Sequence, residues 1–229
     1  MGQASKQKVP VITIDGPTAS GKGTVAQRIA EHLGWHMLDS GALYRLAALS
    51  CLQQDIDLDD SVAVTQRAAT MEIAFKGQEI WLSGHEVSTR LRTEEVGLAA
   101  SQVAAYESLR DALLQRQRAF RQAPGLVADG RDMGTVIFPD APLKIFLTAS
   151  VQARADRRYK QLIDKGNVVN IEDILTDLKV RDERDTQRAI APLRPAADAF
   201  VIDSSKLSID ETVAQVLAYW SNISAKGVS

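Results

Sequence analysis

The sequence predicts an α/β protein, a three-layer fold in which helices cover both faces of a five-stranded parallel sheet. Short, β-branched apolar segments alternate along the chain with longer amphipathic segments, which is the pattern of strands buried between helices. The length, 229 residues, exceeds one average domain. We therefore expect one core that carries an insertion, a small antiparallel β/α subdomain.

The composition excludes several classes of protein. A chain that is 45% hydrophobic and 24% charged is not collagen-like, disordered or a coiled coil. A net charge of −2 argues against binding to nucleic acid or to an anionic membrane, and no apolar run is long enough to span a bilayer. The basic residues are nevertheless unusual in kind, because 17 of the 27 are arginine. Arginine is the side chain best suited to bidentate phosphate recognition.

The cysteine count and the N-terminus indicate the compartment. Cys51 is the single cysteine, so an intrachain disulfide is excluded, and its apolar surroundings predict a buried thiol. Residues 1–8 lack the apolar segment of a secretory signal and predict a disordered tail. We therefore expect a cytoplasmic protein whose single domain covers residues 9–229.

The first part of the chain predicts two strand–helix units. The segment after the tail is continuously apolar and β-branched, as in a buried parallel strand. A glycine-rich turn follows it, and then a helix with apolar residues at a spacing of four that Gly34 ends. The expected elements are a strand at 9–15, a helix at 24–33, a strand at 35–38 and a helix at 43–52.

Residues 57–103 interrupt the alternation of strands and helices and therefore predict the inserted subdomain. Two short strands, 71–75 and 79–82, flank Lys76-Gly77-Gln78 and predict an antiparallel hairpin. A long helix over 101–121 follows, with Leu109, Leu113 and Phe120 on one side.

The remaining elements complete the sheet. Strands are expected at 126–129, 143–147 and 199–203, and the last helix at 209–223. Between the fourth and fifth strands lie two Arg- and Asp-rich helices, 151–164 and 171–188. In parallel sheets the ligand binds beyond the carboxyl ends of the strands, where Asp15, Asp39 and Asp129 stand.

The strongest motif is a phosphate-binding loop. It lies between a strand and a helix, which is the context that a P-loop requires. Gly16 and Gly21 are expected to take positive φ, so that backbone N–H groups and the helix N-terminus face a phosphate, while Lys22 reaches the outer phosphates. The loop reads Gly16-Pro17-Thr18-Ala19-Ser20-Gly21-Lys22-Gly23-Thr24.

One departure bears on the class of P-loop protein. Gly23 stands where the general pattern has the metal-binding Ser or Thr, and Thr24 comes next. The chain also has no NKxD and no DxxG segment, which guanine-nucleotide switches use. These features weaken the interpretation as a GTPase or motor.

Three further segments narrow the interpretation. The chain resembles the bacterial cytidylate kinases, a type of P-loop nucleoside monophosphate kinase, over nearly its whole length after the first eight residues. The resemblance rests on Gly-Lys-Gly-Thr in the loop, on LDSGALYR at 38–45, on ADGRDMGT at 128–135 and on RDERD at 181–185 with Arg188. Ala19 is a mild departure, because that family often has glycine there; we expect the methyl group to be tolerated.

The resemblance implies the reaction and the residues that perform it. It implies transfer of the γ-phosphoryl group from ATP to CMP or dCMP. It also implies that Mg²⁺ is carried by the nucleotide and that the protein has no metal site of its own. It further implies a helical lid over residues 151–190, and it implies that residues 16–24 and the lid residues Arg154, Arg157 and Arg158 bind ATP. Ser40, Ser101, Arg110 and Asp132 are implied around cytosine, Arg181 and Asp185 at the sugar, and Arg45, Arg131 and Arg188 at the acceptor phosphate. Lys22, Arg131 and Arg188 are the expected catalytic residues.

Residue chemistry supports some of these roles independently. Cytosine carries an amino donor where uracil carries an acceptor, so a carboxylate such as Asp132 discriminates between them, with Arg110 to orient it. Arg181, Asp185 and Arg188 share one helix face. The alternatives remain open at this stage: the lid arginines as solvated surface ion pairs, Asp132 and Arg131 as a structural cap and ion pair, Ser40 as an N-cap, and Ser101 as an ordinary helical residue.

Two other functions compete with the cytidylate kinase interpretation. The first is a P-loop kinase for another acceptor such as UMP, which would leave Ser40, Arg110 and Asp132 unused. The second is a nucleotide-dependent switch protein. The expected partners are CMP, dCMP and ATP, without nucleic acid or membrane, and we expect a monomer.

Overall fold

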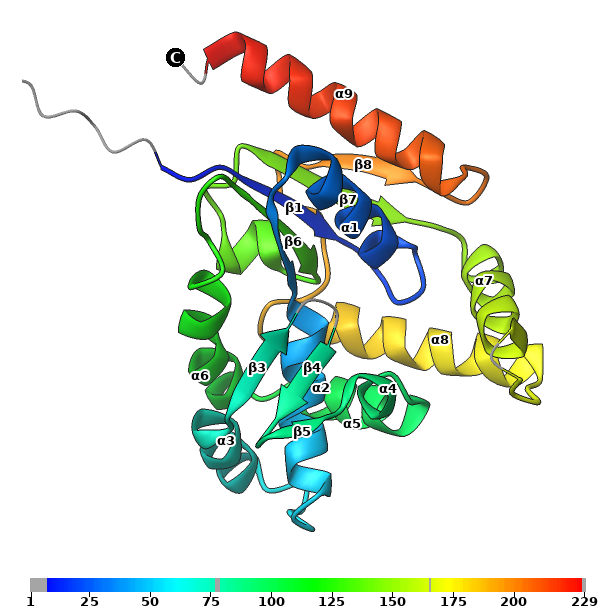
Figure 1. The fold of residues 1–229 in the computed structure, drawn as a ribbon. Helices are drawn as coiled ribbons and strands as arrows, with labels where there is room; N and C mark the ends of the chain where they lie inside the picture. The colour runs from blue at the N-terminus through cyan, green and yellow to red at the C-terminus, as the bar shows by residue number, and fades with distance from the viewer. Residues whose placement is uncertain (1–7, 77–78, 165, 228–229) are drawn as a thin grey trace, which may run out of the picture.

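The computed structural model describes residues 8–76, 79–164 and 166–227. The tail expected at residues 1–8 lies outside the described residues except for Lys8. In the described part, five strands form one parallel sheet, and three short strands form a separate antiparallel sheet in the lower part of Figure 1. The expected α/β class and its five-stranded parallel sheet are confirmed.

The parallel sheet has the strand order β2-β6-β1-β7-β8. Strand β1 is central and pairs with β6 from Val11↔Leu126 to Asp15↔Gly130. It pairs on its other side with β7. This register brings the carboxyl ends of the strands to one edge. The strands are β1 (Val11–Asp15), β2 (His36–Asp39), β6 (Leu126–Gly130), β7 (Leu143–Thr148) and β8 (Phe200–Asp203).

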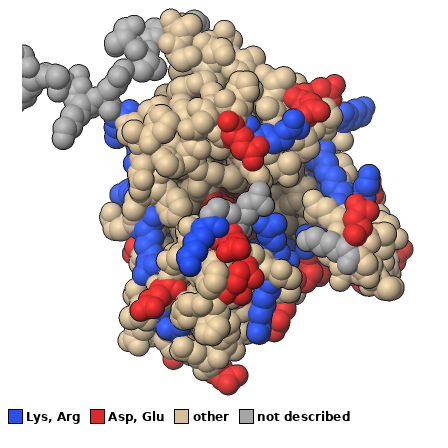
Figure 2. Space-filling view, viewed as in Figure 1, with Lys and Arg blue, Asp and Glu red and all other residues tan. Residues whose placement is uncertain are grey.

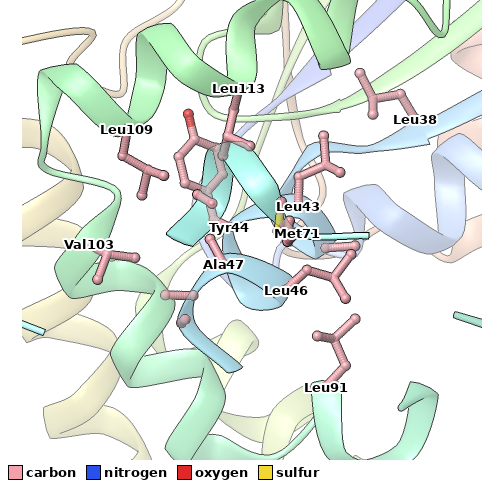
Figure 3. Packing of buried hydrophobic residues seen from close by; sticks show 14 of the residues in the cluster. Leu38, Leu43, Tyr44, Leu46, Ala47, Met71, Leu91, Val103, Leu109 and Leu113 are labelled. Carbon is pink, nitrogen blue, oxygen red and sulfur yellow. The ribbon is translucent and has the colours of Figure 1, made fainter. Parts of the chain in front are cut away.

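Helices cover both faces of this sheet. On one face, α1 (Lys22–Leu33) and α9 (Ile209–Gly227) enclose a core that includes Ile12, Ile14 and Ile145. On the other face, α2 (Ser40–Leu52) and α6 (Glu107–Arg118) enclose a larger core. Figure 3 shows side chains of this larger core converging around α2. Cys51 is fully buried in it, as expected.

Helix α2 begins earlier than expected because Asp39 caps it. The Asp39 carboxylate accepts the amide hydrogen of Ala42, 3.1 Å away, so Ser40 is already the first residue of the helix. Ser40 itself makes no capping bond, and its interpretation as the N-cap is therefore wrong. Its side chain is buried beside β6, where a Cβ on Gly130 would lie 2.6 Å from Ser40 Oγ. Gly130 thus allows Ser40 to face the end of β6.

The segment after β2 contains more elements than the sequence predicted. Its hairpin is confirmed as β3 (Ile73–Lys76) and β4 (Glu79–Leu82), although turn residues 77 and 78 lie outside the described residues. A third strand, β5 (His85–Glu86), pairs with β4. Three elements were not predicted from the sequence: β5, α3 (Ser61–Thr70) and α4 (Ser88–Leu91).

The single helix expected over 101–121 is wrong. Two helices occupy the region, α5 (Glu94–Val103) and α6 (Glu107–Arg118). Thr93 caps α5, and the Tyr106 hydroxyl donates to the carbonyl of Leu58 at 2.8 Å, which fixes the break between the helices. Arg110 donates to the carbonyl of Ala104 at 3.2 Å within the same break.

The lid region consists of two helices that protrude beside the sheet, on the right in Figure 1. They are α7 (Val151–Asp164) and α8 (Ile171–Gln187), close to the expected bounds. Asn170 caps α8 through the amide of Glu172. An unexpected short π-helix, η1 (Met133–Ile137), follows β6. In the described part of the chain, no helix is long and apolar enough to cross a bilayer.

Candidate functional site

A cavity of about 310 Å³ lies where the strands end, between the phosphate-binding loop, helices α2, α5 and α6, and the lid. Figure 2 shows the molecule hollowed between its upper and lower parts, with Lys and Arg side chains interleaved with Asp and Glu. The structure brings most of the expected substrate and lid residues to this one cavity. The expected site residues that line it are Thr18, Ala19, Lys22, Ser40, Arg45, Ser101, Arg110, Arg131, Asp132, Arg158, Arg181, Asp185 and Arg188.

Other expected residues do not line this cavity. The remaining residues of the loop lie directly after β1 or next to the start of α1. Two of the three lid arginines point into protein contacts. The expected residues that lie outside the lining are Gly16, Pro17, Ser20, Gly21, Gly23, Thr24, Arg154 and Arg157.

The phosphate-binding loop has the expected backbone geometry at only one of its two named glycines. Gly21 has a φ of 90°, and α1 begins directly after it. Gly16 does not take positive φ, contrary to expectation; a Cβ there would lie 2.0 Å from the carbonyl oxygen of Leu147, so close approach requires this glycine. Ala19 takes the positive φ instead, at 61°. An L-residue in that region is strained by about 1–2 kcal/mol.

Lys22 is buried inside the loop. Its ammonium group donates to the carbonyl of Pro17 at 3.1 Å, and 8% of the residue is exposed. Burial, helped by the nearby charge of Arg131, lowers the pKa of Lys22 to about 8. The buried Asp129 carboxylate opposes this shift. A charged lysine held at low exposure is suited to an anionic ligand that repays its desolvation.

Arg131 connects the loop to the lid. Its guanidinium donates to Thr18 Oγ1 at 2.7 Å, to Asp185 Oδ2 at 2.8 Å and to the carbonyl of Gly130 at 3.2 Å. Burial alone would raise the pKa of Asp185, but the charge and hydrogen bond of Arg131 lower it below its usual value. Arg131 therefore lies at the junction of the loop, β6 and α8.

A second buried ion pair lies deeper in the cavity. Arg110 of α6 donates to the carboxylate of Asp132, and their side chains are only 8% and 4% exposed. The ring of Tyr44 lies 5.7 Å from the Arg110 guanidinium. Two charged groups held together at this depth, with a cavity beside them, form a polar surface that is fixed before a ligand arrives.

The other cavity arginines are held by backbone carbonyls and one carboxylate. Arg45 donates to the carbonyls of Leu91 and Thr93, at 2.9 and 3.2 Å, and burial lowers its pKa to about 10. Arg181 lies 3.7 Å from Glu94, which also pairs with Arg158. Arg188 donates to the carbonyl of Ala191 at 3.0 Å. Ser101 accepts from Arg184 at 3.1 Å.

The two lid arginines outside the cavity join the lid to the core. Arg154 is 3% exposed and binds Asp182 through both terminal nitrogens, at 2.9 and 2.5 Å. It also donates to the carbonyl of Thr18 at 3.1 Å. Arg157 donates to the carbonyls of Ser20 and Ser204. Neither arginine is a solvated surface residue, so that alternative is wrong for both.

The sequence predicted neither Glu94 nor Asp182 as site residues, and it placed Asp15 and Asp129 at strand ends without assigning them a role. Glu94 and Asp182 hold the lid arginines, and Asp15 and Asp129 lie buried behind the loop. Burial raises the pKa of both Asp15 and Asp129 to about 7. Asp15 and Asp129 had one usable signal, their position at strand ends; Glu94 and Asp182 had none.

Comparisons with known proteins identify the family. The family model described as cytidylate kinase matches residues 12–222. A cytidylate kinase of Bordetella bronchiseptica is 60% identical over 217 residues, covering 95% of this chain and 97% of that protein. Cytidylate kinases of Cupriavidus necator and Aeromonas hydrophila are 59% and 57% identical, covering 94% and 93% of this chain and 97% and 94% of theirs. The chain therefore belongs to the cytidylate kinase family.

Proposed function

We propose that the chain transfers the γ-phosphoryl group of ATP to CMP or dCMP, giving ADP and CDP or dCDP, at the cavity between the loop and α6. One observation carries the proposal. The buried Arg110–Asp132 pair, suited to a base that offers an amino group, shares one cavity with the tip of the phosphate-binding loop. Arg131, the residue before Asp132, donates to Thr18 of the loop and so connects the ion pair to the loop.

The donor side uses the loop and the lid. Residues 16–24 place backbone N–H groups and the start of α1 around the phosphates of ATP, with Lys22 as the buried cation. Arg158 faces the cavity from α7 and adds positive charge over the donor. Arg154 and Arg157 contact carbonyls of the loop, so we assign them to fixing the lid against it.

The acceptor nucleotide is proposed to bind to a second set of arginines in the same cavity. Arg45, Arg131 and Arg188 bind the phosphate of the acceptor, and Arg181 and Asp185 lie at its sugar. Ser40, Ser101, Arg110 and Asp132 surround the cytosine. The bound phosphate would replace backbone carbonyls as the partner of Arg45, which exchanges a neutral acceptor for a charged and stronger one.

Transfer requires alignment more than covalent chemistry. An oxygen of the acceptor phosphate forms a bond to the γ-phosphorus, while the bond from that phosphorus to the β–γ bridging oxygen breaks and ADP leaves. The attacking oxygen is already anionic, so no general base is needed. Lys22, Arg131 and Arg188 disperse the charge that spreads over the transferred group. Lid residues exclude water, which would otherwise accept the phosphoryl group.

The residues present fit a hydrated Mg²⁺ that arrives with ATP. Asp129 Oδ1 is buried without a hydrogen-bond partner among the described residues, and its carboxylate lies beside Gly23. Mg²⁺ prefers oxygen ligands and keeps several waters, so Asp129 would hold the ion through its water shell. When bound, Mg²⁺ neutralises phosphate charge. No group of three or more His, Cys, Asp or Glu suited to a metal occurs in the described part of the chain.

The domain organisation follows from these roles. We assign residues 57–103 to an inserted acceptor-binding subdomain and residues 151–190 to the lid, within a single kinase domain over 9–229. The protein is proposed to act as a cytoplasmic monomer on small nucleotides, without nucleic acid or membrane.

A coupled assay for ADP release tests the proposal. ATP is supplied alone and then with CMP, dCMP, UMP, AMP or GMP. Strong stimulation by the cytidine nucleotides alone is expected. Stimulation mainly by UMP would assign another acceptor, and ADP release independent of any acceptor would assign a nucleotide-dependent switch; either result overturns the proposal.

A further inference from the structure

Arg131 and Asp132 occupy a link of two residues between two fixed elements. Strand β6 ends at Gly130, and the π-helix η1 begins at Met133. The side chains of the link point to different partners, Arg131 to Thr18 and Asp185, and Asp132 to Arg110. The direction of each side chain therefore depends on how the two ends of the link are held.

One residue, Asp15, holds both ends. It is the last residue of β1 and pairs in register with Gly130 at the end of β6. Its carboxylate accepts the amide hydrogens of Met133 and Gly134, through separate oxygens and at 2.8 Å each. The main chain of Asp15 thus lies against the beginning of the link, and its side chain binds the residues that follow it.

The contact requires the ionised carboxylate, the form that the N–H groups of Met133 and Gly134 favour by opposing the burial that raises the pKa of Asp15 to about 7. The first amides of a helix have no partner within it and must be satisfied from outside. Here the π-helix is short, and Asp15 is only 5% exposed, so water does not substitute. Two oxygens face two N–H donors. An asparagine would present one oxygen and one NH₂ group, so one donor would face another donor.

We propose that Asp15 is a positioning residue that sets the direction of Arg131 and Asp132 and so contributes to the choice of base in the acceptor. The inference rests on the proposed function, because it takes Asp132 as the residue that distinguishes cytosine from uracil. Asp15 does not touch the nucleotide; it acts through the backbone of the link.

A second contact fixes the same helix independently. Gly134 packs so closely on β1 that a Cβ there would lie 2.9 Å from Thr13 Oγ1. Thr13 is fully buried and cannot move aside. Gly134→Ala would therefore displace the start of η1 without changing Asp15. Adding Thr13→Ala would remove the nearest atom that the new methyl group meets and leave two carbons of Lys144, at 3.2 and 3.3 Å.

The test measures kcat/KM for CMP and for UMP with Asp15→Asn, together with KM for ATP and thermal unfolding. The expected result is a fall of the CMP-to-UMP ratio by about tenfold or more, because small misplacements of binding groups have large kinetic effects. Both acceptors are compared at saturating ATP and at pH 8, because Arg131 of the link also donates to Thr18 of the phosphate-binding loop and any change in KM for ATP then cancels from the ratio. Gly134→Ala should lower the ratio as well, and Thr13→Ala should restore part of it in the double variant.

The control is Ile14→Val, the neighbouring residue of β1, which is buried in the other core and touches neither amide. It should lower stability and leave the ratio unchanged. If Asp15→Asn folds and keeps the wild-type ratio, the inference is wrong; if it does not fold, Gly134→Ala decides alone by the same criterion. A wild-type enzyme without preference for CMP would instead contradict the proposed function, and the inference with it.

Discussion

Asp132→Asn is the most direct test of how the base is chosen. The carboxylate is 4% exposed and pairs with Arg110, which is 8% exposed. Alanine would leave a buried, unpaired arginine, at a cost of about 3–5 kcal/mol, and would confuse loss of fold with loss of selectivity. Asparagine keeps an oxygen for Arg110 but removes the charge and replaces an acceptor by a donor.

The expected magnitude follows from the hydrogen bonds exchanged. A well-placed contact to a base edge discriminates by about 1–3 kcal/mol, which corresponds to about 5- to 150-fold at 1.4 kcal/mol per tenfold. The amide side chain of the variant would lose the acceptor for the cytosine amino group and offer a donor to the uracil carbonyl. The ratio of kcat/KM for CMP to that for UMP should therefore fall within this range.

The assay is ADP release with each acceptor at saturating ATP, and the matched control is Asp111→Asn. Asp111 is the next residue of α6 after Arg110 and is exposed, so its variant loses the same charge outside the cavity. The control should keep the wild-type ratio. An equal loss of activity towards CMP and UMP in Asp132→Asn would refute the discriminating role.

Three further predictions concern the loop and its surroundings. Lys22→Met should reduce kcat by orders of magnitude while the unfolding transition persists, because the variant loses the buried cation that the proposal places at the phosphates. The control Lys160→Met changes an exposed lysine and should leave kcat unchanged. A Lys22 variant with more than half the wild-type activity would contradict the assignment. Ala19→Gly should raise the free energy of unfolding by about 1 kcal/mol in urea titrations, because glycine adopts the φ of 61° without strain, and an unchanged midpoint would show that the alanine is not strained. Burial raises the pKa of Asp129 from 3.8 to about 7 in the folded protein. Between these pH values the folded protein binds more protons than the unfolded chain. As the pH rises through this range, Asp129 therefore lowers the free energy of unfolding by up to about 1.4 kcal/mol per pH unit. Asp129→Asn should reduce that slope without abolishing it, because burial raises the pKa of Asp15 to about 7 as well. Urea titrations at pH 5 and 7 measure the slope, and an unaltered slope would contradict the raised pKa of Asp129.

Strands and helices of the core were predictable because their signals are local. The apolar run at 9–15 and the spacing of Val25, Ile29 and Leu33 require only neighbouring residues to be interpreted. The break between α5 and α6 was not predictable, since it depends on the Tyr106 hydroxyl reaching Leu58. The short helix η1 depends likewise on Asp15, which lies 118 residues from Met133 in the sequence.

The site was predictable as a set of residue types but not as a set of contacts. The motifs contain Arg45, Arg131, Asp132, Arg181 and Arg188, the family resemblance adds Arg110 and Arg158, and the structure places all seven around one cavity. No pattern in the sequence paired Arg154 with Asp182 or Arg158 with Glu94, because those partners lie on different elements whose packing is decided by the whole fold. The strain at Ala19 was hidden for a similar reason: composition does not reveal a single backbone angle.

The position of β1 at the centre of the sheet has a consequence for biosynthesis. Val11 pairs with Leu126, and Ile12 pairs with Leu143 on the other side, so β1 has no partner until most of the chain has been made. At about 5–20 residues per second, the strand waits on the order of ten seconds after its own synthesis. Throughout that interval a continuous apolar strand is exposed to other nascent chains. Among the strands of the parallel sheet, the segment that leads into the phosphate-binding loop is therefore the first to be synthesised and the one that waits longest for its first partner.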